Sequence, residues 1–172
     1  PLTLPEYLDF VTPGDAYLKD IVRRVGVTDN SERDAQALLD AVTNSFTYSR
    51  DIPSNYVKRP VQMLVDGADD CEGFAVFYQS LLAARGIDSV LIHISGAQMS
   101  KPVAHMLVGV AGDFGREGGT KFFLDADGKK YYTAETTTRG ARIGVLSPEY
   151  LGKIFDVITA GSKVIVAMPV AA

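Results

Sequence analysis

Hydrophobic positions in the first half of the chain recur at helical spacing. This spacing predicts helices over residues 15–25, from about Ser31 to Phe46, and as a short turn over 61–65. Ser31 and Asp34 form a weakened capping-box pattern at the start of the second helix. The N-terminal part of the chain is therefore predicted to be helical.

The segment 71–85 has the clearest helical pattern of the chain. Its large apolar side chains lie three or four residues apart, at positions 74, 77, 78, 81 and 82. Asp70 is a good N-cap candidate, and Gly86 follows where a left-handed residue ends a helix. Cys71 is therefore expected in the first turn of a buried helix.

After Gly86 the hydrophobic pattern changes to the alternation of strands. Strands are predicted over residues 89–95, 104–111, 120–125 and 130–136. Asp127-Gly128 is a strong hairpin signal between the last two. Helices followed by an antiparallel sheet make an α+β domain.

The last part of the chain is predicted to add one helix and one strand. Ser147 followed by Pro148 is typical of an N-cap and a first helical position. The helix that they open has apolar positions between Tyr150 and Ile158, and a final strand is predicted over 163–168.

Length and composition indicate one globular domain. With 172 residues, 47% hydrophobic and 22% charged, we expect residues 1–172 to form a single domain with its core over about 15–140 and the C-terminal helix and strand at 147–168. A net charge of −4 argues against a nucleic-acid partner. No membrane span and no signal peptide are predicted within the given chain.

One cysteine and two histidines limit the chemistry that the chain can perform. Cys71 alone cannot form an intrachain disulfide, and with so few soft ligands we expect no metal site; no nucleotide or organic cofactor is indicated either. A thiol reacts as the thiolate, which a helix N-terminus and a histidinium both favour. His105, on a predicted strand, is the preferred base, and His93 is the rival.

A catalytic histidine needs a third group that orients it, and the reaction needs hydrogen-bond donors for an oxyanion. Glu135, after the predicted hairpin, could orient His105. The backbone N–H of Cys71 is the obvious first oxyanion donor, and Gln62 or Tyr56 could supply a second. Structural roles remain open for these residues, since a lone cysteine often only packs and a strand glutamate often only forms a cross-strand pair.

Three segments carry a further signal, in the same order along the chain. Residues 69–75 read Asp-Asp-Cys-Glu-Gly-Phe-Ala and lead into the helix ending at 85–86, residues 104–108 read Ala-His-Met-Leu-Val, and residues 131–137 read Tyr-Tyr-Thr-Ala-Glu-Thr-Thr. Together with a tyrosine-near-aspartate stretch over 42–51, they resemble the transglutaminase-like superfamily of papain-like thiol enzymes, in its prokaryotic type.

The resemblance implies a papain-like core in which N-terminal helices, including the nucleophile helix, pack on an antiparallel sheet. It also implies a triad of Cys71, His105 and Glu135. Two positions depart from the usual pattern, because Glu135 stands where aspartate is more common and Asp69 stands where glycine is usual. We expect at least one of the two carboxylates before Cys71 to point away from the thiol, capping the helix or pairing with a base.

The implied reaction is acyl transfer at a peptide or carboxamide bond through a thioester on Cys71. Hydrolysis by a cysteine peptidase is slightly favoured over crosslinking by a transglutaminase. The alternative from another class is a non-catalytic, transglutaminase-like module that binds peptides. A protein or peptide substrate is expected, whereas the sequence indicates neither its identity, nor an oligomeric state, nor a compartment.

Overall fold

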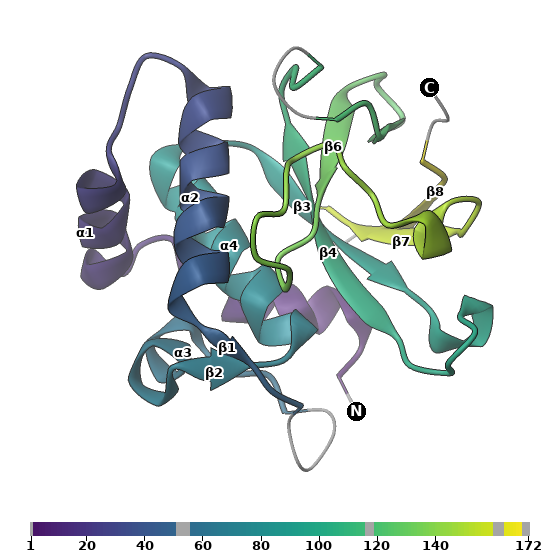
Figure 1. Cartoon of the computed structure of the whole chain (residues 1–172), viewed down its shortest axis with the longest axis horizontal. Helices are drawn as coiled ribbons and strands as arrows, with labels where there is room; N and C mark the ends of the chain where they lie inside the picture. The colour runs from purple at the N-terminus through teal and green to yellow at the C-terminus, as the bar shows by residue number, and fades with distance from the viewer. Residues whose placement is uncertain (1, 51–55, 116–118, 160–163, 170–172) are drawn as a thin grey trace.

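The chain folds as a six-stranded antiparallel sheet with helices packed on one face (Figure 1). The computed structural model describes residues 2–50, 56–115, 119–159 and 164–169. Its helices are the 3₁₀ segments η1 (Leu4–Phe10), η2 (Gly96–Gln98) and η3 (Pro148–Tyr150), and α1 (Ala16–Val25), α2 (Ser31–Ser45), α3 (Pro60–Asp66) and α4 (Cys71–Arg85). The predicted α+β arrangement, with the nucleophile helix on an antiparallel sheet, is confirmed.

The strands of the main sheet follow the order β5-β6-β4-β3-β7-β8, and all neighbours are antiparallel. They are β3 (Ser89–Ile94), β4 (His105–Ala111), β5 (Phe122–Leu124), β6 (Lys130–Ala134), β7 (Phe155–Ile158) and β8 (Val164–Ala167). A separate parallel pair joins β1 (Thr47–Tyr48) to β2 (Ala68–Asp69). The two-residue strands β1 and β2 are too short to leave a periodic pattern, and the sequence did not predict them.

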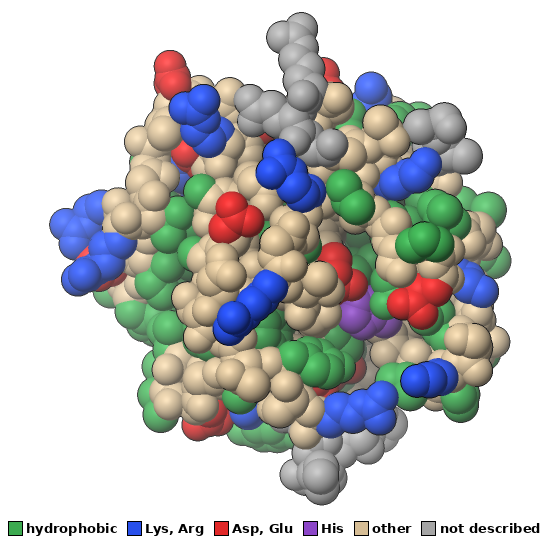
Figure 2. All heavy atoms as spheres, viewed as in Figure 1, with side chains coloured by type: hydrophobic (Ala, Val, Ile, Leu, Met, Phe, Trp, Pro, Cys, Tyr) green, Lys and Arg blue, Asp and Glu red, His purple; other side chains and the backbone are tan. Residues whose placement is uncertain are grey.

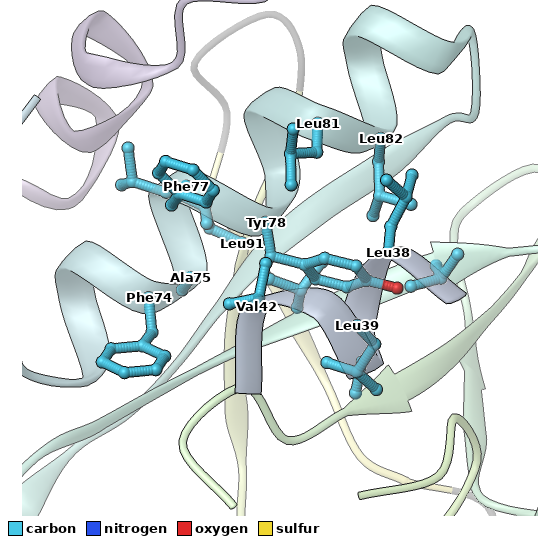
Figure 3. Packing of buried hydrophobic residues seen from close by; sticks show 14 of the residues in the cluster. Leu38, Leu39, Val42, Phe74, Ala75, Phe77, Tyr78, Leu81, Leu82 and Leu91 are labelled. Atoms are coloured by element: carbon cyan, nitrogen blue, oxygen red, sulfur yellow. The ribbon is translucent and has the colours of Figure 1, made fainter. Parts of the chain in front are cut away.

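Helix α4 lies between the other helices and the sheet, so it is buried on all sides. The Asp70 carboxylate accepts a hydrogen bond from the Glu72 N–H at 3.0 Å, and Gly86 ends the helix with φ of 80°, as predicted. Figure 3 shows side chains of α4 interleaved with those of α2 and β3. The buried Tyr78 hydroxyl donates to the Ala35 carbonyl at 2.9 Å, which satisfies a polar group inside this core.

Two apolar clusters cover the two faces of the sheet. On β3, Leu91 belongs to the cluster beneath the helices, whereas Val90 and Ile92 belong to a cluster on the opposite face. Phe123 and Phe155 complete that second cluster with an edge-to-face contact at 6.3 Å between ring centroids. The strands are therefore buried on both faces, and the sheet is the centre of the molecule.

The predicted C-terminal helix is wrong. The segment forms only the short turn η3, and Gly152, in a left-handed conformation with φ of 73°, follows it. Residues 155–158 are β7, which pairs with β3 on one side and β8 on the other. Phe155 and Ile158 are buried on opposite faces of the sheet. Because both faces of β7 bear buried apolar side chains, its sequence has no sustained polar–apolar alternation and resembles that of a buried helix.

Two other details differ from the sequence predictions. The cap of α2 is Asn30, whose side chain accepts from the Arg33 N–H at 2.7 Å, and Ser31 is the first residue inside the helix. Position 163, the predicted start of the last strand, lies outside the described residues. Within the described chain, no helix combines the length and apolar character needed to cross a membrane.

Candidate active site

Cys71 is the first residue of α4, and its position is fixed by the strand that precedes it. The β1–β2 pair continues into neighbouring turns, with the Thr47 N–H donating to the Gly67 carbonyl at 3.0 Å and the Ser49 N–H to the Asp69 carbonyl at 2.8 Å. The Cys71 side chain is mostly buried, with 8% of the residue exposed. The sulfur therefore lies at the N-terminal end of a capped helix, where backbone N–H groups favour negative charge.

The two carboxylates before Cys71 have different structural roles. Asp70 caps α4, as one of them was expected to do. Asp69 is fully buried, and its Oδ1 accepts from the Asp70 N–H at 2.9 Å. Its Oδ2 lies where a side chain at Gly73 would begin, because a Cβ added there would be 1.8 Å away. Gly73 is thus the residue that makes room for the unusual Asp69.

His105 and Glu135 come together because β4 and β6 are neighbours in the sheet. His105 begins β4, Glu135 follows the last residue of β6, and His105 Nε2 is 2.7 Å from Glu135 Oε2. The other carboxylate oxygen of Glu135 accepts from Thr137, at 2.9 Å from its N–H and 2.7 Å from its hydroxyl. The carboxylate is therefore held in place on the side away from the imidazole.

The electrostatics of this pair favour its charged form. Burial lowers the pKa of His105, but hydrogen bonds to Cys71 and to Glu135 outweigh burial and raise the pKa to about 10. Burial raises the pKa of Glu135, but the hydrogen bond with His105 and the donors of Thr137 lower it below its usual value. The imidazole therefore interacts with both of the residues that were singled out with it.

Tyr150 of η3 stacks on the His105 ring. The ring centroids are 5.2 Å apart and the planes differ by 10°. Tyr150 is 7% exposed, so it shields one face of the imidazole from solvent. Stacking and the Glu135 hydrogen bond together restrict rotation of the His105 side chain.

Two pockets, each of about 320 Å³, border His105 and share Glu149 and Tyr150 as a boundary. The described residues that line only the first pocket are Tyr48, Arg50, Met99, Ser100, Lys101, Val103 and Ala104. The described residues that line only the second pocket are Glu135, Thr137, Thr138, Ala141, Arg142, Val145 and Ser147. Figure 2 shows a histidine at the base of a hollow that is open to the surface. The imidazole is therefore reachable from two sides.

The remaining candidates lie elsewhere in the fold. The Gln62 side chain accepts from the Arg59 N–H at 2.9 Å and donates to the Tyr56 hydroxyl at 2.7 Å, and neither Gln62 nor Tyr56 lines the two pockets around His105. An oxyanion role for either one stays a prediction. His93 Nδ1 lies 3.2 Å from Asp156 on β7, so the rival histidine has a cross-strand partner of its own.

Sequence reasoning did not single out several residues of the pockets. Tyr48 was noted only within the upstream resemblance, although it contacts the first pocket, and the pKa of its hydroxyl is raised by burial and then by the charges of Cys71 and Asp70. Tyr150 was assigned to the face of a helix. A signal existed only for Tyr48, since Tyr150 reaches His105 through tertiary packing that no local pattern records.

The sequence matches no protein-family model and no curated protein. Among solved structures, a candidate cysteine protease from Cytophaga hutchinsonii superposes with a TM-score of 0.52 at 14% identity, over 99% of this chain and 54% of that one. A candidate protease from Parabacteroides distasonis gives 0.52 at 12% identity, over 83% of this chain and 30% of that one. Legionella pneumophila LapG gives 0.45 at 17% identity, over 86% and 88% of the two chains.

The chain has a papain-like, transglutaminase-like fold. At these identities the similarity shows the fold alone, and the chain spans about half of the first of these proteins and less than a third of the second. What the site does must therefore be argued from its own residues.

Proposed function

We propose that this protein is a cysteine peptidase in which Cys71 is the nucleophile, His105 the general acid and base, and Glu135 the residue that orients the histidine. The observation that supports it most is the contact of 2.7 Å between His105 Nε2 and Glu135, on an imidazole whose pKa is also raised by its interaction with Cys71. Because Nε2 is engaged by Glu135, Nδ1 is the ring nitrogen left for the sulfur. A thiolate paired with an imidazolium at a helix N-terminus is an activated nucleophile.

The reaction begins when the Cys71 thiolate attacks the carbonyl carbon of a peptide bond. The His105 imidazolium gives its proton to the leaving nitrogen, the C–N bond breaks, and the acyl group remains on sulfur as a thioester. Neutral His105 then takes a proton from water, whose hydroxide attacks the thioester. The C–S bond breaks, the acid leaves, and the thiolate and imidazolium are restored.

Hydrolysis and crosslinking share every step up to the thioester, and they differ in the second nucleophile. The hollow that contains a histidine is open on the surface in Figure 2, and the first pocket around His105 is lined largely by polar groups. Water therefore has access to His105, the residue that would activate it for attack on the thioester. This supports hydrolysis over a transfer that depends on excluding water.

The first test is alkylation of Cys71 by iodoacetamide at pH 6. A free thiol is almost fully protonated there, since its ordinary pKa is about 8.5, so we expect the wild-type protein to react at least ~10-fold faster than His105→Ala. The rate constants are measured by mass spectrometry at excess reagent. Equal, slow rates in both proteins would favour the non-catalytic peptide-binding module.

The matched control for this test is His93→Ala, which removes the other histidine of the chain. It should react like the wild type, and the opposite pattern would make His93 the base.

A peptide library, incubated with and without cadaverine, then separates hydrolysis from amine transfer by product mass. Cys71→Ala must abolish both products, and Glu135→Gln should slow turnover by roughly 10-fold or more, because it weakens the orienting hydrogen bond.

A further inference from the structure

The two pockets beside His105 differ in charge. Among the described lining residues, the first pocket has two cations, Arg50 and Lys101, against one carboxylate, Glu149. The second pocket has one cation, Arg142, against two carboxylates, Glu135 and Glu149. The described lining of the first pocket is therefore basic, in a chain whose net charge is −4.

Tyr48, which lines the first pocket with Arg50, connects this pocket to the proposed nucleophile. Burial and then the charges of Cys71 and Asp70 raise the pKa of the Tyr48 hydroxyl, and the charge of Arg50 lowers it by less. Tyr48 thus interacts with the guanidinium and lies within electrostatic range of Cys71. His105 lines both pockets, and its pKa of about 10 keeps it protonated at neutral pH, so the difference in charge between the pockets comes from their other lining residues.

The wall that bears Arg50 is held in register with the nucleophile helix. Tyr48 pairs with Asp69 in the parallel β1–β2 ladder, two residues before Cys71. Lys101 lines the same pocket from the segment between η2 and β4, which leads into His105. Figure 2 shows blue side chains along the lower rim of the hollow that contains the histidine. Arg50 and Lys101, from two separate segments of the chain, line a cavity of about 320 Å³, large enough for an amino-acid side chain.

We infer that this pocket, lined by Arg50 and Lys101, binds an acidic side chain of the peptide substrate beside the scissile bond. The inference rests on the proposed function, since it assumes a peptide substrate, and it deepens that function by naming a substrate class. A carboxylate there would gain charge-assisted hydrogen bonds from a guanidinium and an ammonium group. The second pocket, with its excess of carboxylates, does not favour an acidic side chain, so the preference applies to one side of the scissile bond.

The test compares an anionic and a neutral reagent at Cys71, iodoacetate and iodoacetamide. The ratio of their rate constants reports the electrostatic potential at the sulfur, and it can be measured even if Cys71 reacts as slowly as a free thiol. The double substitution Arg50→Glu with Lys101→Glu should lower this ratio by roughly 3-fold to 10-fold at low ionic strength, and added salt should reduce the difference. The single substitutions Arg50→Gln and Lys101→Gln should each lower it less.

The matched control is Lys19→Glu with Arg23→Glu, an equal change in charge on α1, which contributes no described residue to either pocket. Its ratio should equal that of the wild type, and circular dichroism verifies that each variant is folded. An unchanged ratio in the double variant would overturn the inference, even with iodoacetamide reactivity that depends on His105. Slow, His105-independent alkylation with a changed ratio would instead overturn the proposed function and leave a basic pocket.

With peptides that the protein cleaves, glutamate, glutamine and lysine are placed in turn on each side of the scissile bond. Glutamate should raise kcat/KM over lysine by roughly 10-fold on one side only, and the double variant should reverse that order. If kcat/KM does not depend on the charge of the side chain on either side of the scissile bond, the inference is overturned while the proposed function stands.

Discussion

His105 is the residue at which separate parts of the fold meet. Its ring hydrogen-bonds Glu135 beyond β6 and stacks on Tyr150 of η3, and its interaction with Cys71 on α4 helps to raise its pKa. Its side chain is 14% exposed and that of Glu135 is 17% exposed, so the pair is only partly screened by water. A charged pair in this setting connects the protonation of the site to the stability of the fold.

The contribution of this pair to stability should depend on pH in two directions. The pKa of His105 rises from 6.5 to about 10 on folding, so its stabilisation is complete below pH 6.5 and is lost as pH rises through 10. The pKa of Glu135 falls below 4.5, so its stabilisation is complete above pH 4.5 and is lost as pH falls through the lower folded value. The combined contribution should therefore be largest between pH 4.5 and 6.5.

Urea unfolding of the wild type and of a variant with His105→Gln and Glu135→Gln measures this contribution. The difference in free energy of unfolding between the two proteins should peak in that window and decline on both sides. A difference that stays constant from pH 4.5 to pH 10 would contradict the ion pair.

At the scale of elements, the two ends of α4 can be predicted from the sequence, whereas the strand pairing that positions its start cannot. Asp70 and Gly86 mark its two ends by local chemistry, and both were predicted correctly. The parallel contact of β2 with β1 depends on chain segments about 20 residues apart, and strands of two residues leave no periodic signal. The segment 150–158 was misassigned because a strand buried on both faces has no alternation.

The same distinction applies to the candidate site. Cys71, His105 and Glu135 were singled out from helix-end chemistry, hairpin position and a family resemblance. That an imidazole and a carboxylate meet depends on the pairing of β4 with β6, which a strand pattern does not specify. Tyr150 and Lys101 left no local signal, since they approach His105 only through tertiary packing.

Gly73→Ala tests how Asp69 is accommodated beside the nucleophile helix. The new Cβ would lie 1.8 Å from Asp69 Oδ2, so either the carboxylate or the helix must move. We expect a loss of about 1–3 kcal/mol in the free energy of unfolding, typical of overpacking, although alanine is the better helix former. Thermal or urea unfolding measures it.

The control for this substitution is Gly14→Ala, at a glycine whose added Cβ would meet nothing within 4 Å. Its effect should be within about 0.5 kcal/mol of zero. Combining Gly73→Ala with Asp69→Ala should cost less than the sum of the two single changes, because the clash is removed. Strict additivity would show that Gly73 and Asp69 do not interact.

At the scale of the whole molecule, the sheet depends on a core on the face opposite the helices. Phe155 is fully buried there and contacts Phe123, and β7, which contains it, lies between β3 and β8. Tyr150 belongs to the same apolar cluster, only a few residues before β7. Packing on this face therefore also supports the side chain that stacks on His105.

Phe155→Ala should destabilise the whole protein by about 3–5 kcal/mol, since it opens a cavity among fully buried side chains. The unfolding midpoint in urea gives the magnitude. Leu151→Ala, in the same segment but at a residue that is 44% exposed, is the matched control and should cost less than about 1 kcal/mol. Equal losses in the two variants would argue against a second core on this face.

The parallel pairing of β1 with β2 has a consequence for how the cleft could adjust its width. Tyr48 pairs with Asp69, and the Ser49 N–H donates to the Asp69 carbonyl, so the backbone that leads to Arg50 is tied to the segment directly before Cys71. Lys101 and Glu149, which line the same pocket, lie in segments that make no backbone hydrogen bond to the β1–β2 pair among the described residues. We therefore expect any widening that admits a bulkier peptide to come from the segments of Lys101 and Glu149 rather than from the β1–β2 pair.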